Sequence, residues 1–209
     1  MIKNIIFDFD GVILDSVPIK TEAFRKLFEK FSSDEVEKLI YYHVENGGVS
    51  RYLKIKYFFE EILEKSITEE EVQKYAQNYS ELTKQELTNP QYLIEDTLKF
   101  IQQNYQKYNM HIASGADEKD LQYICKKLEL TKYFLSINGS PIKKEKIVFR
   151  ILANNHYKKN ETILIGDSTN DYQAALENGI KFFAYNNHTL LHKHTYIKSF
   201  TDFLNDTDT

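Results

Sequence analysis

The run Ile5-Ile6-Phe7, followed at once by Asp8-Phe9-Asp10-Gly11, is the most informative stretch of the chain. Consecutive apolar residues without polar alternation are typical of a strand buried on both faces of a parallel sheet. Residues two apart in a strand face the same way, so Asp8 and Asp10 are expected to project together into the crevice at the strand's carboxyl end. Two carboxylates this close repel each other unless a cation or a proton separates them. The pair therefore suits a divalent metal site, or a nucleophile beside an acid.

Further short apolar runs predict more strands of the same kind, at residues 110–113, 133–135, 163–165 and 180–185. Apolar residues at helical spacing separate these runs. Strands that alternate with helices predict an α/β fold. We expect a Rossmann-like parallel sheet with helices on both faces and right-handed crossovers.

The segment 16–89 has a different pattern, because it shows helical periodicity and no clear strand. Pro18 precedes one apolar helix face, and Ser32-Ser33-Asp34-Glu35 and Thr68-Glu69-Glu70-Glu71 each resemble a capping box at a helix start. An all-helical block between the first two strands indicates an inserted domain, and Asn89-Pro90 is a natural point of return. The predicted domains are a core of residues 1–15 and 90–209 and a helical insertion of residues 16–89.

The overall composition excludes several classes of protein. The chain has 209 residues, a formal net charge of -4 and a pI of about 5.9, which argue against a strongly basic nucleic-acid binder. A single cysteine, Cys125, excludes an intramolecular disulfide and a multi-cysteine zinc site. No apolar run approaches the length of about 20 residues that a membrane span needs, and Asp8 comes too early for a signal peptide. We expect a cytoplasmic protein without a nucleic-acid or membrane partner, and the composition predicts no oligomeric state.

A second acidic motif, Gly166-Asp167-Ser168-Thr169-Asn170-Asp171, follows the apolar run 163–165. Asp167 is expected at the end of that strand and Asp171 about one turn later. Together with the first motif, this would place four carboxylates in one crevice. A Mg²⁺ ion, a lysine and one retained proton would bring their charge close to neutral, and carboxylates are ligands that Mg²⁺ prefers.

Two other segments offer groups that bind phosphate. Ser114-Gly115 follows the run 110–113 and presents a hydroxyl and free backbone N–H groups to a phosphate oxygen. Lys143-Lys144 follows Gly139-Ser140-Pro141, and a lysine there would balance the charge of a nucleophile and of a phosphoryl group.

One loop of the insertion is a candidate for substrate recognition. In Asn46-Gly47-Gly48-Val49-Ser50-Arg51, the glycines allow the backbone to approach a ligand closely. Arg51 would hold an anionic or polyhydroxylated part of a substrate, with an ordinary surface charge as an equal alternative.

Taken together, these motifs resemble those of the haloacid dehalogenase-like (HAD) hydrolase superfamily. The stretch from Asp8 to Ser16 resembles the first motif in the style of phosphoglycolate phosphatases and β-phosphoglucomutases. Ser114, the Lys143-Lys144 pair and the stretch from Gly166 to Asp171 match the second, third and fourth motifs in order. The resemblance covers residue 1 to about 185, and the helical insertion is similar to the cap of that family. The tail after residue 187 resembles no known segment.

The resemblance implies a role for each acidic residue. Asp8 is implied as the nucleophile that forms an aspartyl-phosphate, and Asp10 as the general acid that protonates the leaving alkoxide and later activates water. Mg²⁺ would be held by Asp8, the backbone carbonyl of Asp10 and Asp167, while Asp171 would bind it through water or orient its neighbours. Asp10 needs a proton for its acid role, so we expect the nearby carboxylates to raise its pKa despite the metal.

The resemblance also implies roles for the phosphate-binding groups. Ser114 and the N–H groups beside it, including that of Gly115, would hold the phosphoryl oxygens. The Gly-Ser-Pro-x-x-Lys spacing favours Lys144 as the catalytic lysine, with Lys143 as the alternative.

The function expected from these residues is a Mg²⁺-dependent phosphatase that acts on a small phosphomonoester of a sugar, polyol, amino alcohol or small acid. A sugar phosphomutase on the same core is the nearest alternative. An alternative of another class is a phosphorylation-dependent signalling module without turnover. A dehalogenase is disfavoured, because halide displacement does not need the acid and metal groups that Asp10 and Asp171 supply.

Overall fold

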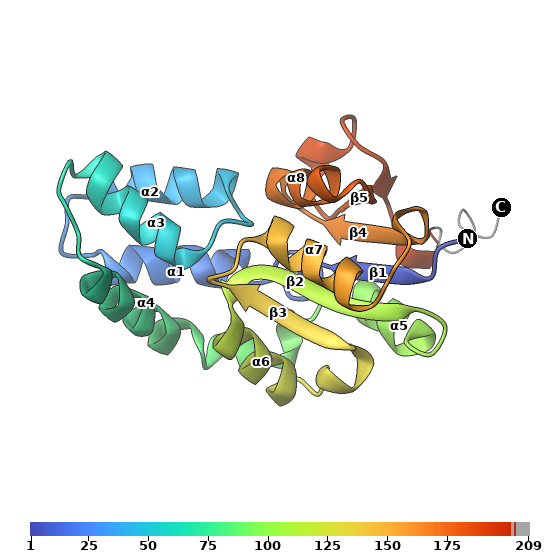
Figure 1. Ribbon diagram of the computed structural model, residues 1–209. Helices are drawn as coiled ribbons and strands as arrows, with labels where there is room; N and C mark the ends of the chain where they lie inside the picture. Colours follow the sequence, from blue (N-terminus) through green and yellow to red (C-terminus); the bar gives the residue numbers. More distant parts are fainter. Residues whose placement is uncertain (202, 204–209) are drawn as a thin grey trace.

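A computed structural model describes residues 1–201 and 203 of the chain. Within these residues the strands form one six-stranded parallel sheet in the order β3-β2-β1-β4-β5-β6 (Figure 1). The strands are β1 (Asn4–Phe7), β2 (Asn109–Asp117), β3 (Ser136–Ser140), β4 (Thr162–Gly166), β5 (Lys181–Tyr185) and β6 (Tyr196–Ile197). The α-helices are α1 (Val17–Leu27), α2 (Ser33–Glu45), α3 (Arg51–Tyr57), α4 (Glu69–Thr83), α5 (Glu95–Asn104), α6 (Glu118–Lys127), α7 (Lys144–Asn154) and α8 (Thr169–Asn178).

Helices cover both faces of the sheet. Successive residues of β1 point to opposite faces, so each face of β1 packs against a different pair of helices. Ile5 and Phe7 are fully buried in an apolar cluster shared with α5 and α6. Ile6 is equally buried in a second cluster shared with α7 and α8. Apolar contacts on both faces explain why Ile5-Ile6-Phe7 in β1 is an unbroken apolar run. The predicted α/β class with a parallel sheet is confirmed.

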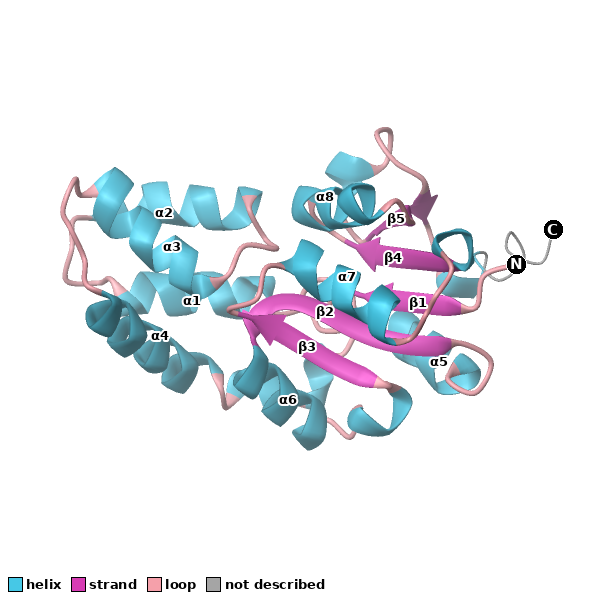
Figure 2. Cartoon of the chain, in the orientation of Figure 1, coloured by secondary structure: helices cyan, strands magenta, loops and turns pink. Residues whose placement is uncertain are grey.

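Helices α1 to α4 lie between β1 and β2 in the chain and to one side of the sheet (Figure 2). They share an apolar cluster of their own, in which Phe24, Phe28, Leu39 and Phe58 are nearly inaccessible to solvent. Both predicted capping boxes are present: Ser32 and Glu35 begin α2, and Thr68 and Glu71 begin α4. The four helices therefore have a core separate from the two that flank the sheet.

The strand predicted at residues 133–135 is wrong in position. A short 3-10 helix occupies Thr131–Tyr133, and the strand is the more polar segment Ser136–Ser140. β3 is an edge strand of the sheet, where half-exposed positions do not need apolar residues. Phe134 instead packs on the ring of Phe7, with the ring centroids 6.1 Å apart.

The tail after residue 187 also joins the core. β6 adds to the edge of β5, and Phe200 packs 4.6 Å from the ring of Phe100 and 6.3 Å from that of Phe7. No helix in the described part of the chain has the length and apolarity needed to cross a membrane.

Candidate active site

The strand order reverses beside β1, and acidic residues gather at this point. β2 and β3 lie on one side of β1, whereas β4 and β5 lie on the other. Open α/β sheets bind ligands at the carboxyl ends of the strands where such a reversal occurs. Asp8 follows β1 and Asp167 follows β4, and the N–H of Asp8 donates to the carbonyl of Ile165 at 2.8 Å. Both carboxylates therefore lie at the same edge of the sheet.

Asp171 joins these two carboxylates from the first turn of α8. Asp8, Asp167 and Asp171 each place a carboxylate oxygen within 4.8 Å of the others. The hydroxyl of Ser168 donates to Asp171 Oδ2 at 2.6 Å and fixes that carboxylate at the start of the helix. Gly11, with a φ of 75°, makes room for this cluster, because a Cβ there would lie 2.0 Å from Asp167 Oδ2.

Lys144 supplies a cation to the cluster. Its side chain is buried, and its Nζ lies 2.7 Å from Asp8 Oδ1 and also contacts Asp171 Oδ1. Burial alone would lower the pKa of Lys144, but the two carboxylates outweigh this effect and raise it above its usual value. Lys143 is exposed at the position before α7, so of the two lysines only Lys144 reaches the acids.

The acidic cluster has the ligand type and the charge that a small divalent cation requires. Carboxylate oxygens are hard ligands of the kind that Mg²⁺ binds. Three carboxylates and one ammonium leave two negative charges, which one divalent cation would neutralise. Burial and the charge of Asp171 raise the pKa of Asp8 to about 7, and burial and Asp8 raise the pKa of Asp167 well above its usual range. Crowded, buried carboxylates behave this way when one ammonium offsets only part of their negative charge.

Asp10 faces the same crevice but has a cation of its own. Lys20 Nζ lies 2.5 Å from Asp10 Oδ1, and the hydroxyl of Ser16 donates to the same oxygen at 2.5 Å. Burial raises the pKa of Asp10, but the charge of Lys20 and the hydrogen bonds from Lys20 and Ser16 outweigh burial and leave the pKa below its ordinary value. The expectation of a raised pKa is therefore wrong, because it considered the neighbouring carboxylates and not Lys20.

Ser114 and Gly115 lie where the core meets the helical insertion. Ser114 is fully buried, and its hydroxyl donates to Asp10 Oδ2 at 3.5 Å and accepts from the N–H of Ala116 at 3.1 Å. Both residues lie within β2, at an irregularity in its pairing with β3, and not after the strand as predicted. A Cβ on Gly115 would lie 2.3 Å from the carbonyl oxygen of Gly48, so the loop of the insertion rests directly on this strand.

Arg51 links the insertion to the core. Its guanidinium bonds to Asp120 Oδ2 at 2.8 Å and to the hydroxyl of Ser80 at 2.5 Å, and its side chain is 7 % exposed. It also stacks over the ring of Tyr79 at 4.9 Å. The charge of Arg51 is therefore already balanced by Asp120. Arg51 also lines the cavity described next.

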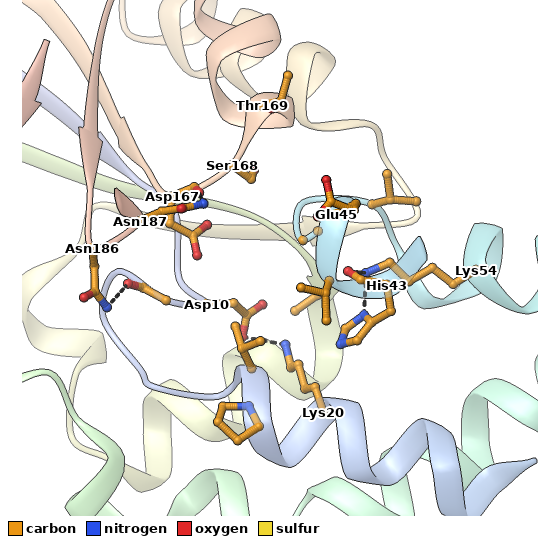
Figure 3. A pocket seen from close by; sticks show the side chains of 18 of the residues that line it. Asp10, Lys20, His43, Glu45, Lys54, Asp167, Ser168, Thr169, Asn186 and Asn187 are labelled. Carbon is orange, nitrogen blue, oxygen red and sulfur yellow. Dashed lines mark hydrogen bonds and ion pairs between the residues drawn. The ribbon is translucent and has the colours of Figure 1, made fainter. Parts of the chain in front are cut away.

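A cavity of about 690 Å³ separates the acidic edge of the sheet from the insertion (Figure 3). Asp10 and Asp167 line it from the core. Lys20, His43 and Lys54 line it from α1, α2 and α3. In Figure 3 the side chains of Asp10 and Lys20 meet at the centre, and those of His43 and Lys54 meet on the side of the insertion.

Sequence reasoning missed these three basic residues. The sequence holds one indication that Lys20 lies near the acidic loop. Pro18 marks the start of α1, which places Lys20 in the first turns of the helix that follows the loop. For His43 and Lys54 there is no such indication, because their contact depends on how α2 packs against α3.

The segment directly after β5 contributes two further residues that were not predicted. The side-chain amide of Asn186 donates to the carbonyl of Gly11 at 2.9 Å, and that of Asn187 donates to the carbonyl of Asp167 at 2.7 Å. These bonds fasten the two loops that carry the acidic residues.

Comparison with known proteins agrees with the fold and identifies the family. Residues 5–185 match the family described as haloacid dehalogenase-like hydrolase. Two curated relatives resemble the chain over most of their length. A phosphorylated carbohydrates phosphatase of Thermotoga maritima is 25% identical over 188 residues, which cover 86% of this chain and 82% of that protein. A phosphoglycolate phosphatase of Aliivibrio fischeri is 27% identical over 192 residues, 88% of this chain and 83% of that protein.

Solved structures share the fold over nearly the whole chain. A β-phosphoglucomutase from Clostridium difficile superposes with a TM-score of 0.78 at 18% identity, covering 99% of this chain and 96% of that one. A predicted phosphatase from Clostridium acetobutylicum has a TM-score of 0.75 at 18% identity and covers 99% of both chains.

Proposed function

The chain belongs to the haloacid dehalogenase-like hydrolase family, and from that premise we propose that it is a Mg²⁺-dependent phosphatase of small-molecule phosphomonoesters. The observation that carries the proposal is the contact of the Lys144 ammonium with both Asp8 and Asp171, beside Asp167, where the strand order reverses. The two curated relatives, both named phosphatases, support the same class of reaction.

We assign the metal to the residues of the acidic cluster. Asp8, the backbone carbonyl of Asp10 and Asp167 would hold Mg²⁺, with Asp171 beside them. When bound, the ion would screen the negative charge of the phosphate from that of the attacking carboxylate. Phosphoryl transfer depends more on positioning and charge neutralisation than on elaborate covalent chemistry, which suits a site rich in fixed charges.

In the proposed first step, a carboxylate oxygen of Asp8 attacks phosphorus. The bond from phosphorus to the leaving oxygen breaks, and the alkoxide takes a proton from the carboxyl of Asp10. In the second step, water attacks the aspartyl-phosphate and loses a proton to Asp10, and the carboxylate of Asp8 is released together with inorganic phosphate. Lys20 favours the ionised form of Asp10 that the second step needs, while the charge of a bound phosphate favours the protonated form that the first step needs.

The phosphoryl oxygens would be held by groups on the other side of the crevice. In this assignment the hydroxyl of Ser114, the N–H of Gly115 and the ammonium of Lys144 would each contact a phosphoryl oxygen. In the free protein the Ser114 hydroxyl contacts Asp10 Oδ2, and Lys144 Nζ contacts Asp8. The hydroxyl, the N–H and the ammonium are the partners that a transferring phosphoryl group needs as its charge is redistributed.

We further propose that residues 16–89 act as a cap over a catalytic core of residues 1–15 and 90–209. Helices α1, α2 and α3 of the insertion supply one wall of the 690 Å³ cavity, which is a size typical of small-molecule sites. A cap that covers the phosphate excludes bulk water during the first step. The substrate is then a small phosphate ester, with the cap residues selecting its leaving group.

The test of the proposed function is release of inorganic phosphate from p-nitrophenyl phosphate. We expect turnover with Mg²⁺, loss of turnover to background with EDTA, and recovery when Mg²⁺ is added in excess. A phosphomutase would return the phosphoryl group to a sugar phosphate without net phosphate release. A signalling module would keep a stable phosphoryl group on Asp8. Turnover that persists in EDTA would overturn the metal assignment.

The ion pair of Lys20 with Asp10 predicts a shift in the pH profile. Lys20 lowers the pKa of Asp10, so Lys20→Met raises it, by about 1–3 units for the loss of an adjacent opposite charge. An acid that must hold its proton works below its pKa, so the alkaline limb of kcat/KM against pH should move to higher pH in the variant. Lys26→Met, at an exposed position of α1, is the control. If the alkaline limb of the pH profile does not move in Lys20→Met, Lys20 does not control the protonation of Asp10.

A further inference from the structure

The segment that follows β5 crosses the ends of two other strands at the acidic edge of the sheet. β4 lies between β1 and β5, so a side chain behind β5 reaches the loop of β1 only past the end of β4. The amide of Asn186 does so and donates to the carbonyl of Gly11. The amide of Asn187 donates to the carbonyl of Asp167, in the loop after β4 (Figure 3). Two neighbouring side chains therefore connect the loops of β1 and β4 beyond the ends of the strands.

Within the acidic cluster, the carboxylate of Asp167 has the fewest partners. Asp8 contacts Lys144, and Asp171 contacts both Lys144 and Ser168. In the part of the chain that the structure describes, no hydrogen bond or ion pair reaches the carboxylate of Asp167, and its bond with the segment after β5 is made by its backbone. The place of this carboxylate therefore depends on its own backbone and on the atoms that its side chain lies against.

Both of these supports lead to the two asparagines. Asn187 holds the backbone of Asp167 directly, at 2.7 Å. On the other side the carboxylate lies against Gly11, where a Cβ would be 2.0 Å from Asp167 Oδ2. Asn186 holds Gly11 by its carbonyl, at 2.9 Å. One asparagine thus fixes where the side chain of Asp167 begins, and the other fixes the backbone against which that side chain ends.

Both asparagines are themselves held in the conformation that makes these contacts. Asn186 has a φ of 54°, a left-handed conformation that asparagine adopts more readily than most residues. Asn187 Oδ1 accepts from the N–H of Thr189 at 3.0 Å and from its hydroxyl at 2.8 Å. The amide nitrogen of Asn187 is then left facing Asp167, and it cannot turn away without the loss of both bonds to Thr189.

We propose that Asn186 and Asn187 are positioning residues for Asp167 and thereby set the affinity of the acidic cluster for Mg²⁺. The inference rests on the proposed function, in which Asp167 is a ligand of the metal. Partners that hold a metal ligand in place keep its site preorganised, and their loss typically weakens metal binding by about 10–100-fold. In this role neither asparagine contacts the metal or the reacting atoms, because each acts through the backbone of another residue.

A different role for Asn187 is purely structural, since its Oδ1 caps the 3-10 helix His188–Leu190. Serine is an equally good cap, but its hydroxyl ends one bond short of the amide nitrogen. Asn187→Ser therefore keeps the cap and removes the contact with Asp167. In the same way, Asn186→Gly keeps the left-handed backbone and removes the contact with Gly11.

The experiment measures Mg²⁺ binding by isothermal titration calorimetry in the absence of substrate. Asn187→Ser should raise the Kd for Mg²⁺ by about 10-fold or more. Asn186→Gly should also raise it, because the carboxylate of Asp167 loses the fixed backbone beside it. Asn155→Ser is the matched control. It removes the same kind of bond, from an amide to the carbonyl of Ile151, at the end of α7 far from Lys144, and should keep the Kd of the unmodified protein.

Steady-state hydrolysis of p-nitrophenyl phosphate adds a second measurement. In Asn187→Ser the Mg²⁺ concentration for half-maximal turnover should rise by the same factor as the Kd. KM for the ester at saturating Mg²⁺ should stay that of the unmodified protein, because the substitution weakens a metal ligand and not the ester site. A purely structural role would lower Tm and leave the Kd for Mg²⁺ unchanged.

The outcome that overturns the role of either asparagine is an unchanged Kd for Mg²⁺ in its folded variant. Circular dichroism and thermal unfolding establish that each variant is folded. If Asn187→Ser does not fold, Asn187→Thr, whose hydroxyl also caps a helix, takes its place.

The two proposals can fail separately. If the unmodified protein binds Mg²⁺ and hydrolyses p-nitrophenyl phosphate while both variants keep its Kd, only the positioning role is wrong. If the Kd responds as expected but no ester is hydrolysed, the phosphatase function is wrong and the positioning role stands. If the unmodified protein neither binds Mg²⁺ nor hydrolyses an ester, both are wrong.

Discussion

Asp8→Asn should reduce phosphatase turnover by about 10⁴-fold or more, the loss expected when a covalent nucleophile is removed. The substitution keeps the size of the side chain, and an amide still accepts a hydrogen bond from Lys144 at the position of Asp8 Oδ1. The loss should therefore appear in kcat, because the substrate groups that bind elsewhere in the cavity are untouched. Steady-state hydrolysis of p-nitrophenyl phosphate at saturating Mg²⁺ measures it.

Two controls separate chemistry from folding in this experiment. Circular dichroism and thermal unfolding should show that Asp8→Asn remains folded. Asp34→Asn, at an exposed position in the first turn of α2, should retain full turnover. More than one hundredth of the original kcat in a folded Asp8→Asn protein would mean that another group attacks phosphorus.

Lys144→Met should damage both stability and activity, while Lys143→Met should do neither. Lys144 is buried between Asp8 and Asp171, so its removal leaves carboxylates without their partner. Breaking a buried ion pair from one side costs about 3–5 kcal/mol, and urea unfolding of the metal-free protein measures that cost. Turnover should fall by about 10²–10³-fold or more, as when a group that stabilises transition-state charge is removed.

Lys143→Met is a closely matched comparison, because the same change is made one residue away. Lys143 is exposed, so its free energy of unfolding should change by no more than about 0.5 kcal/mol. Equal effects of the two substitutions would show that Lys144 does not serve the acidic cluster in the way that its contacts suggest.

The sequence predicts the acidic edge of the sheet well, because the signal is local. Asp8 directly follows one short apolar run, and Asp167 follows another after a single glycine. A strand end fixes where the next side chain points. The sequence signal for the starts of α2 and α4 is equally local, since a capping box involves residues three apart. The strand at Ser136–Ser140 could not be predicted from apolar runs, because an edge strand does not need an apolar pattern.

The basic residues at the cavity could not be predicted in the same way. Lys20 meets Asp10 only because α1 begins close behind the acidic loop, and His43 meets Lys54 only because two separate helices pack together. These contacts depend on tertiary packing, which periodicity and spacing do not encode. For that reason the pKa of Asp10 was expected to be raised, whereas Lys20 and Ser16 lower it. The position of Asp10 at the crevice was expected correctly.

The side-chain amides of Asn186 and Asn187 have a consequence for folding during translation, because they hold loops that are made before them. β1 lies in the middle of the sheet and pairs with β4, which is made more than a hundred residues later. The loops behind Asp8 and Asp167 are then tied by side chains from near the end of the chain. A nascent chain halted before these asparagines would carry all four acidic residues of the site and still lack the fastenings of the loops, so competence should arise only after residue 187 has been made.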